Sequence, residues 1–157
     1  MLRAGVLRGP VVSISQVGGD ELSEVRALLE ANGLPTSDLS TGITLLGTRD
    51  LRGLEGIVGL EVHGRFGLVR SLAVRSDRRG GGLGSALVAE VERLAATRGI
   101  ASLYLLTTTA EPFFGRRGYR AVPREGAPAA IRATSEFASV CPASAAFMTK
   151  FLTVPAS

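Results

Sequence analysis

The feature that most constrains the fold of this chain is a strand-to-helix junction near the middle of the sequence. Residues 70–88 read RSLAVRSDRRGGGLGSALV: an apolar, strand-like segment, a basic turn, three consecutive glycines and the start of a helical pattern. Glycine lets backbone N–H groups approach an anion because no Cβ intervenes, and a helix start leaves N–H groups unpaired with partial positive charge. The junction is therefore typical of a site that cradles a phosphate.

Two common phosphate-binding motifs are excluded at this junction. A Walker loop places a lysine directly after its glycines, and Lys150 is the only lysine of the chain. A dinucleotide fingerprint that starts at Gly80 needs a glycine at position 85, where Ser85 stands. A Rossmann unit also places its glycine loop after an early strand of the chain, whereas this junction stands near the middle of the sequence. Either the junction holds another kind of phosphate, or it is a plain loop before a helix.

Composition bounds the class of protein. The 157 residues are 45% hydrophobic, which supplies the core of one domain spanning 1–157. No apolar run of 18 residues occurs, and Arg3, Arg8 and Pro10 interrupt the N-terminal segment, so a cytoplasmic protein without membrane contact is expected. With only Cys141 and His63 as soft ligands, neither an intrachain disulfide nor a metal site is expected.

The charged residues favour an anionic small ligand over nucleic acid. The formal net charge is +4, and all basic residues except Lys150 are arginines, whose guanidinium groups suit phosphates and carboxylates. Nucleic acid is not expected as a partner, because the arginines are scattered and only 5% of the residues are aromatic, with no tryptophan for stacking on bases.

Hydrophobic periodicity predicts strands that alternate with helices. Strands are expected at residues 11–15, 43–50, 54–62, 66–74, 101–109, 119–122 and 145–152. Helices are expected from Asp20, as the capping residue, to Gly33, from Gly82 to Arg98 and from Glu111 to Arg117, with a helical turn at 36–40 and an amphipathic segment at 128–140. This order predicts an α/β fold in which helices cover a mixed sheet.

Two segments resemble a known family. Residues 79–84, RGGGLG, match the R/Q-x-x-G-x-G/A pattern of the GCN5-related N-acetyltransferases (GNAT), after a predicted strand and at the start of the longest helix. Residues 113–119, FFGRRGY, resemble the aromatic-Tyr-x-x-x-Gly-Phe segment of the same family. The resemblance implies a GNAT fold: a mixed, mostly antiparallel sheet of six or seven strands with strands four and five splayed. The C-terminal IRATSEFASVCPASAAFM further resembles small acetyltransferases of bacterial arsenic-resistance operons.

The GNAT resemblance implies an N-acetyltransferase that moves an acetyl group directly from acetyl-CoA to the amine of a small molecule, such as a toxic amino-acid analogue. It also implies that the loop amides hold the pyrophosphate and that a strand holds the pantetheine arm. The implied acetyl-CoA-binding residues are Leu72, Ala73, Val74, Arg79, Gly80, Gly81, Gly82, Leu83, Gly84, Ser85 and Phe114. Arg78 or Arg79 is expected to meet the phosphates, whereas Arg75 is expected to be a solvated turn residue. A homodimer is an expectation of the same kind, with residues 128–152 as the candidate contact.

The sequence departs from the family pattern where the chemistry is expected. The tyrosine that usually serves as acid is replaced by Phe114, and the two usual positions of a carboxylate base hold Leu68 and Leu106. A phenyl ring donates no proton, and leucine accepts none. A catalytically weak acyl-CoA-binding sensor or interaction domain is therefore the alternative function.

Glu61 is the remaining carboxylate of the central hairpin. A two-residue turn at 63–64 or 64–65 puts Glu61 on the same face as Leu68 and Arg70. The catalytic hypothesis is that Glu61 deprotonates the substrate ammonium, directly or through water, while Arg70 tunes Glu61 or holds a substrate carboxylate. The alternative is a cross-strand ion pair on a solvated face.

Three further residues are candidates for a role in the site on the basis of their residue types: Thr107, Tyr119 and Cys141. Thr107, with the two threonines that follow it, lies where the splay is expected, so its hydroxyl either bonds the acetyl carbonyl or belongs to a good strand former. Tyr119 is a substitute acid or a core residue. Cys141 is expected to be a small buried hydrophobe rather than an arsenic ligand, because no second thiol accompanies it.

Overall fold

The computed structural model describes residues 13–34, 36, 39, 42–134, 137 and 144–152. The strands are β1 (Ser15–Gln16), β2 (Ile43–Asp50), β3 (Gly53–His63), β4 (Phe66–Val74), β5 (Ser102–Thr107), β6 (Arg120–Ala121) and β7 (Ala146–Phe151). The helices are α1 (Leu22–Ala31), α2 (Leu83–Thr97), α3 (Glu111–Gly115) and α4 (Ala129–Arg132), with short 3₁₀ turns η2 (Gly19–Glu21), η3 (Ser76–Arg78) and η4 (Arg124–Gly126).

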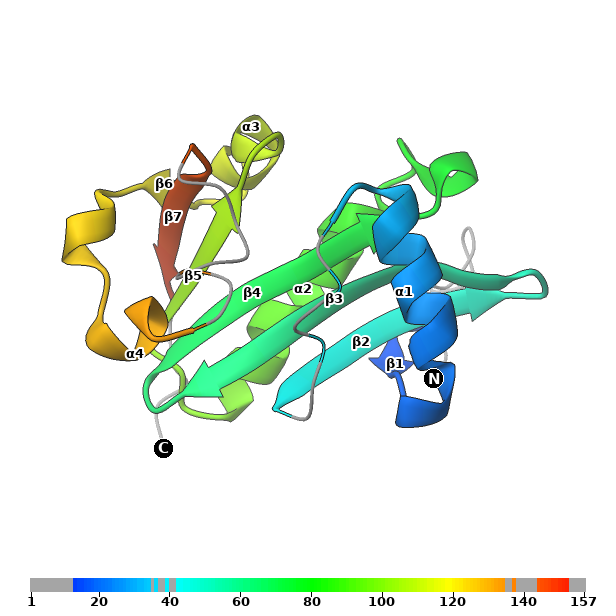
Figure 1. The fold of residues 1–157 in the computed structure, drawn as a ribbon, viewed down its shortest axis with the longest axis horizontal. Coiled ribbons are helices and arrows are strands. Elements are labelled where there is room, and N and C mark those ends of the chain that lie inside the picture. The colour runs from blue at the N-terminus through cyan, green and yellow to red at the C-terminus, as the bar shows by residue number, and fades with distance from the viewer. Residues whose placement is uncertain are drawn as a thin grey trace, which may run out of the picture.

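The strands form one seven-stranded sheet in the order β1-β2-β3-β4-β5-β7-β6 (Figure 1). Every neighbouring pair is antiparallel except β4 and β5, which run parallel. The expected α/β fold, with a mixed and mostly antiparallel sheet flanked by helices, is confirmed. The parallel contact joins only residues 66–68 to residues 102–104, and beyond it the two strands separate (Figure 1).

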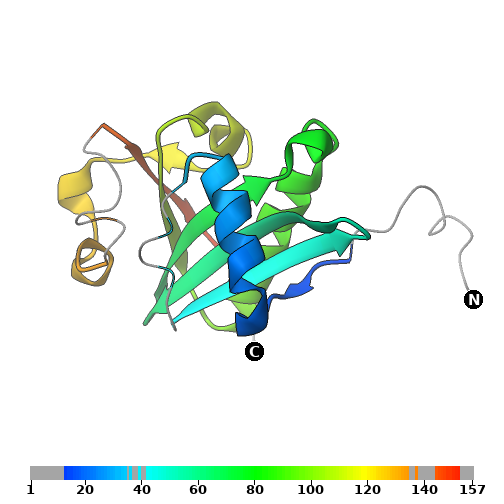
Figure 2. The same cartoon turned by 45° about the vertical axis from the view of Figure 1, so that its right-hand side comes forward.

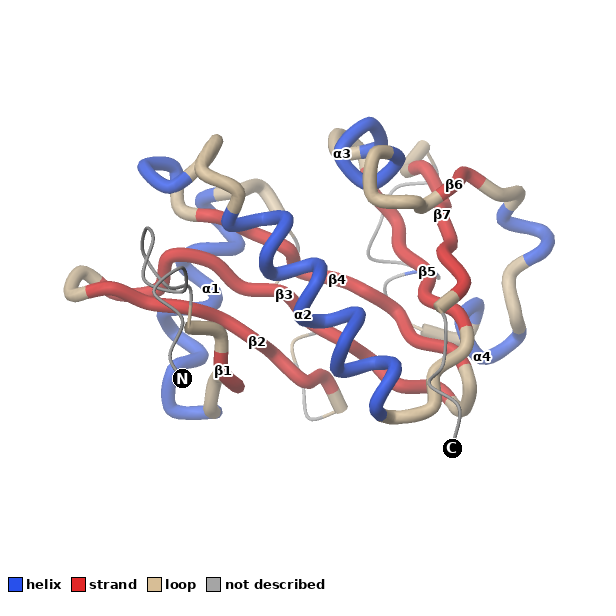
Figure 3. The backbone as a smooth tube through the Cα atoms, turned by 180° about the vertical axis from the view of Figure 1, so that it is seen from behind, coloured by secondary structure: helices blue, strands red, loops and turns tan. Residues whose placement is uncertain are grey.

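Alternating side chains of the central strands build a separate core on each face of the sheet. Leu45 and Ile57 pack with the buried residues of α1 on the face that Figure 2 shows in front. Their neighbours Leu46 and Val58 point the other way and pack with α2, which lies in front of the sheet in Figure 3, where the molecule is seen from behind. Strands β2, β3 and β4 are therefore packed between α1 on one face and α2 on the other.

The β3–β4 hairpin sets the positions of the candidate catalytic side chains. Its turn lies at residues 64–65, and the pairing runs from His63↔Phe66 through Glu61↔Leu68. The predicted register is confirmed, so Glu61 and Leu68 share a face. Beyond Gly59↔Arg70 the register shifts by one residue, and two residues of β4 then oppose one of β3. Such a bulge leaves a residue outside the regular ladder, and Ser71 within it has a φ of 60°.

The start of the first helix differs from the prediction. Asp20 does not cap it: residues 19–21 form η2, and the carboxylate of Glu21 accepts a hydrogen bond of 3.0 Å from the backbone N–H of Gly18. Glu21 caps this turn because it stands three residues after Gly18, the spacing at which a carboxylate side chain can accept the N–H of the capping residue. The apolar face of the helix is as predicted, with Val25, Leu28 and Leu29 buried.

Several predicted strand limits were too wide. Strand β5 ends at Thr107 rather than at 109, because the Thr107 hydroxyl accepts the Ala110 N–H at 2.9 Å and the chain turns there. Strand β1 covers Ser15–Gln16 instead of residues 11–15, of which 11 and 12 lie outside the described residues. Cys141 and parts of the segments expected at 36–40 and 128–140 also lie outside them.

Leu87 anchors α2 to the sheet and provides a test of this packing. Its side chain is fully buried, and a Cβ added to Gly56 of β3 would come within 2.9 Å of it. Replacing Leu87 with alanine is expected to lower the free energy of unfolding by about 2–5 kcal/mol, because a cavity replaces apolar contacts. Urea unfolding measures this change.

The matched control for this variant is Leu51→Ala, since Leu51 is fully exposed in the β2–β3 turn. Its free energy of unfolding is expected to change by no more than about 0.5 kcal/mol. Equal losses in the two variants would contradict the proposed anchoring role of Leu87.

Candidate active site

A pocket opens where β5 separates from β4. Its walls come from both strands, from the C-terminal end of α1 and from the start of α3. The lining residues are Asn32, Leu34, Val69, Arg70, Ser71, Leu72, Leu105, Leu106, Thr107, Thr109, Ala110 and Phe114. Arg70 is the only charged residue among them. The pocket therefore combines an apolar body with hydroxyl groups and a single guanidinium group.

Arg70 is buried, and its charge is compensated from the neighbouring strand. Its Nη1 lies 2.7 Å from Glu61 Oε2, and only 1% of its side chain is exposed. His63 Nε2 lies 3.0 Å from the other carboxylate oxygen of Glu61. The predicted proximity of Glu61 and Arg70 is thus found, but Glu61 does not line the pocket. Arg70 faces the pocket, and Glu61 lies behind it with 14% of its side chain exposed.

The two leucines at the usual positions of the base are buried in an apolar cluster. Leu68 and Leu106 pack there with Ile131 of α4 and Phe147 of β7. Leu106 also lines the pocket between β4 and β5. Neither of these two positions therefore carries a group that could accept a proton.

No tyrosine hydroxyl lines this pocket. Phe114 occupies the position expected for the family's acid and is buried, with its ring edge-on to those of Phe113 and Tyr119. The Tyr119 hydroxyl instead donates a hydrogen bond of 2.9 Å to Glu92 of α2. Burial and the adjacent Glu92 carboxylate raise the pKa of Tyr119 far above its usual range. Tyr119 is therefore a core residue in this structure.

Thr107 lines the pocket, but its hydroxyl already has a structural partner. Its Oγ1 accepts the N–H of Ala110 at the start of α3, which leaves its own proton to donate. Thr108 and Thr109 are both exposed, and of these two only Thr109 lines the pocket.

The glycine loop leads into α2 without a side-chain cap. Gly80 and Gly82 have φ angles of 83° and 87°, a conformation that favours glycine. Gly82 is the N-cap of α2, no side chain bonds there, and the first turn of α2 carries no acidic residue. A second pocket borders this loop, lined by Val74, Arg78, Arg79, Gly80, Gly82, Leu83, Gly84, Ser85, Phe113 and Arg117. Backbone N–H groups with no competing carboxylate make this helix start suitable for an anion.

Strand β4 connects the two pockets. Leu72 lines the pocket between the strands, and Val74 lines the one at the glycine loop. Ala73 differs, because its side chain is buried under α1 and only its backbone is available to a ligand. Beyond Leu68 the edge of β4 is no longer paired with β5, so backbone groups on that side face the opening.

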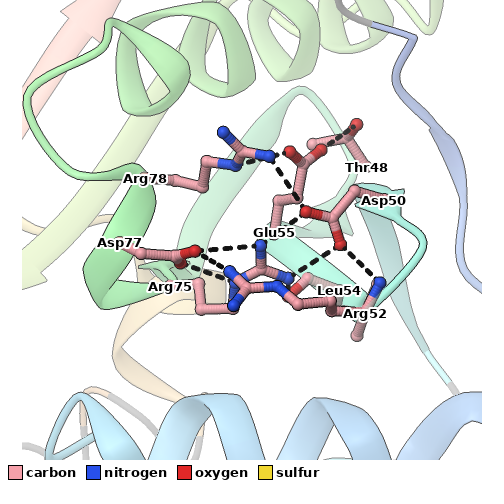
Figure 4. Close-up of polar contacts among 8 residues, drawn as sticks. All are labelled: Thr48, Asp50, Arg52, Leu54, Glu55, Arg75, Asp77 and Arg78. Atoms are coloured by element: carbon pink, nitrogen blue, oxygen red, sulfur yellow. Dashed lines mark hydrogen bonds and ion pairs between the residues drawn. The ribbon is translucent and has the colours of Figure 1, made fainter.

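A network of charges fixes the chain immediately before the glycine loop (Figure 4). Arg75 binds both carboxylate oxygens of Asp50, at 3.0 and 2.6 Å, and its Nε lies 2.7 Å from Asp77. Arg78 lies 3.0 Å from Asp50 and 2.9 Å from Glu55. The expectation that Arg75 is a solvated turn residue is therefore wrong, because Asp50, 25 residues away in the sequence, and the nearby Asp77 bind its guanidinium group.

Asp50 is the centre of this network. It accepts hydrogen bonds from Arg75 and Arg78 and from the backbone N–H of Arg52. The hydrogen bonds with Arg75 hold the pKa of Asp50 well below its usual range, with smaller contributions from Arg52 and Arg78. The acids of β2 and β3 thus neutralise two of the arginines near the loop.

Two other arginines at the loop have neutral partners. Arg79 donates to Val74 O at 3.3 Å and to Asn32 Oδ1 at 2.8 Å. Arg117 donates to Phe113 O at 2.7 Å and to the Ser85 hydroxyl. Sequence reasoning missed Asn32 and Arg117. The i, i+4 spacing of Phe113 and Arg117 at a short helix was the available signal for the second.

Within the described residues no group of three or more His, Cys, Asp or Glu side chains is placed to hold a metal ion. None of the helices in the same part of the chain is long and apolar enough to cross a membrane.

Comparison with known proteins adds independent evidence. Residues 43–121, which include the glycine loop and the central hairpin, match the sequence profile of the Acetyltransferase (GNAT) domain. N-acetylglutamate synthase from Neisseria gonorrhoeae, complexed with coenzyme A and N-acetyl-glutamate, superimposes with a TM-score of 0.77 at 22% identity. That match covers 93% of this chain and 36% of the synthase, so this chain spans about a third of that protein.

Two shorter proteins match over nearly their whole length. A Mycobacterium tuberculosis protein in complex with CoA has a TM-score of 0.73 at 20% identity, covering 90% of this chain and 99% of its own. An aminoglycoside 6′-N-acetyltransferase complexed with coenzyme A has a TM-score of 0.68 at 17% identity, covering 92% and 99%. At these identities the likeness establishes a shared fold.

The Asp50 network predicts a pH-dependent stability. Asp50→Asn is expected to lower the free energy of unfolding at pH 7, because Arg75 and Arg78 lose their shared carboxylate. The pKa of Asp50 is lowered in the folded state. Its stabilisation is therefore complete above the unfolded pKa of about 3.9 and is lost as the pH falls through the folded value.

Chemical unfolding of the wild type and Asp50→Asn between pH 7 and pH 2 measures this difference. Asp20→Asn serves as the control, because Asp20 is an exposed carboxylate. A gap between wild type and Asp50→Asn that stays constant, or widens, toward acid pH would contradict the assignment.

Proposed function

The chain belongs to the GNAT acetyltransferase family, and on this premise we propose that it transfers an acetyl group from acetyl-CoA to the amine of a small molecule. One observation carries the proposal. The uncapped glycine loop, the unpaired edge of β4 and the pocket between β4 and β5 follow one another along the chain. An acyl-CoA needs these three parts in this order, for its pyrophosphate, its pantetheine arm and its thioester.

The donor is held mainly by backbone groups in this proposal. The N–H groups around Gly80, Gly82 and the first turn of α2 bind the pyrophosphate, as the positive end of a helix favours an anion. The pantetheine amides pair with the free edge of β4 near Leu72 and Val74, in the manner of an added strand. The thioester then lies in the pocket near the bulge at Ser71.

In the transfer step, the neutral amine nitrogen attacks the thioester carbonyl carbon, a C–N bond forms and the C–S bond breaks. An amine with a pKa near 10.4, like that of lysine, must first lose a proton at neutral pH. Glu61 lies behind Arg70, so we assign it the proton through a bridging water rather than by direct contact. As the amide forms, its nitrogen loses a second proton to water, and the departing CoA thiolate, whose thiol has a pKa of about 8.5, takes up a proton from water.

The charge of the pocket supports an acceptor that carries an anionic group. Among the described lining residues, Arg70 alone is charged, and none is a carboxylate that would attract a polycation. We assign Arg70 the role of binding a carboxylate of the substrate, with Glu61 orienting its guanidinium group. An amino acid, or a toxic amino-acid analogue as in arsenic resistance, has this chemistry. N-acetyl-glutamate, found in the Neisseria synthase, is a related acetylated amine.

One observation favours a second function. Phe114 stands where the family's acid is expected, and Leu68 and Leu106 occupy the usual positions of the base. A domain that binds acyl-CoA but transfers the acetyl group slowly, acting as a sensor or interaction module, has the same donor site. The two functions differ only in whether an acceptor amine binds in the pocket and reacts.

An amine panel tests the proposed activity. Purified protein is incubated with acetyl-CoA and amino acids, polyamines or aminoglycosides, and thiol release is measured. We expect kcat/KM to be about 10-fold or more higher for amines that carry a carboxylate, because the buried guanidinium group of Arg70 binds that group. Preference for polyamines would contradict the acceptor class, and CoA binding without transfer to any amine would favour the sensor.

Glu61→Gln tests the proposed base. On the preferred amine, we expect kcat/KM to fall by about 100-fold and the acidic limb of its pH profile to disappear, because glutamine accepts no proton. Glu125→Gln, a change at an exposed carboxylate of η4, should keep the wild-type profile. If Glu61→Gln stays folded with an unchanged rate and pH profile, Glu61 is not the base.

A further inference from the structure

Arg117 is held rigidly beside the glycine loop. Its guanidinium carbon lies 3.8 Å above the centre of the Phe113 ring, and its Nη1 donates a hydrogen bond of 2.7 Å to Phe113 O. Its other terminal nitrogen contacts the hydroxyl of Ser85 in the first turn of α2. Stacking and two hydrogen bonds thus place a cation at a defined position next to the start of α2.

The surroundings of Arg117 are electrostatically unfavourable for a cation alone. The N-terminal end of α2 carries a partial positive charge, and its first turn has no acidic residue. Arg79, on the same pocket, also has only neutral partners within the described part of the chain. Arg75 and Arg78, by contrast, pair with carboxylates. Positive charge is therefore left uncompensated on the side of the loop that Arg79 and Arg117 share.

Arg117 also lies between two pockets. One contains the glycine loop, and the other runs along the flank of α2, lined by Ser85, Val88, Ala89, Glu92, Arg116, Arg117 and Lys150. Ser85 and Arg117 are common to both. The guanidinium group of Arg117 would therefore lie close to an anion bound in either pocket, at the glycine loop or along α2.

We propose that Arg117 binds a phosphate group of coenzyme A, beside the phosphate site formed by the loop amides. This inference rests on the proposed function and adds a side chain from the turn after α3 to the donor site. A guanidinium group offers forked donors that match phosphate oxygens. The stacking on Phe113 fixes the fork in advance, so less conformational entropy is lost on binding. The phosphate is either in the pyrophosphate or at the 3′ position of the ribose.

Titration calorimetry with three ligands tests the proposal: CoA, dephospho-CoA, which lacks the 3′-phosphate, and pantetheine, which lacks all phosphates. Arg117→Met removes the charge and keeps an apolar stem for Phe113. We expect it to raise the Kd of CoA by about 10-fold or more and to leave pantetheine binding unchanged, because only the phosphates meet Arg117. Arg117→Lys should show a smaller loss.

Dephospho-CoA identifies the phosphate. If Arg117→Met weakens dephospho-CoA as strongly as CoA, the contact is with the pyrophosphate, and if dephospho-CoA is unaffected, the contact is with the 3′-phosphate. Either result supports the proposal. Arg120→Met is the matched control, because Arg120 also lies over a phenyl ring, that of Phe151 at 5.3 Å, but outside both pockets. It should bind CoA as the wild type does.

Three results would overturn the inference. An unchanged Kd of CoA in Arg117→Met does so while leaving the proposed function intact. An equal loss of pantetheine binding assigns Arg117 a purely structural role. Failure of the wild type to bind CoA removes the proposed function along with the inference. If Arg117→Met does not fold, Arg117→Gln keeps a donor for Ser85 without the charge, and the same expectations apply.

Discussion

The short contact between β4 and β5 is the constraint on which the rest of the candidate site depends. The two strands pair over only three residues each, while β7 pairs with all six residues of β5 and β3 pairs with β4 along its length. Each strand is therefore held by its outer neighbour as the two separate. Because each strand stays paired with its outer neighbour, a gap remains between β4 and β5. The pocket lies in this gap, and backbone groups of β4 face it. The bulge at Ser71 adds a local change of direction where β4 borders the pocket.

Charge is divided across the glycine loop in two ways. On one side, Asp50, Glu55 and Asp77 neutralise the arginines that precede the loop, so that this segment is fixed by the protein itself (Figure 4). On the other side, Arg79 and Arg117 have only neutral partners in the described part of the chain. The first arrangement holds the loop in place, and the second leaves positive charge for a ligand. Arg70 differs from both groups, because it lines the pocket while Glu61 of the neighbouring strand compensates its charge.

Local patterns predicted much of this structure. The turn expected after His63 predicts the hairpin register, and this register puts Glu61 and Arg70 on one face, as in the structure. The prediction failed where two local signals competed. Asp20 had the composition of a helix cap, but Glu21 reached Gly18 first. The run of threonines after Leu106 had strand propensity, but the Thr107 hydroxyl bonded Ala110 and ended the strand.

Local sequence patterns predict the order of the elements, the central hairpin and the glycine loop, because periodicity and glycine conformations act over a few residues. They also predict an anion site after the strand within residues 70–88, and this site stays a prediction. Only the tertiary structure decided which arginines are neutralised, since Asp50 and Arg75 lie 25 residues apart and meet through the packing of β2, β3 and β4. It likewise decided that Arg70, rather than Glu61, faces the pocket, and that Arg117 lies against Ser85, 32 residues earlier. Contacts between such distant residues depend on how whole strands and helices pack, which no local pattern of the sequence records.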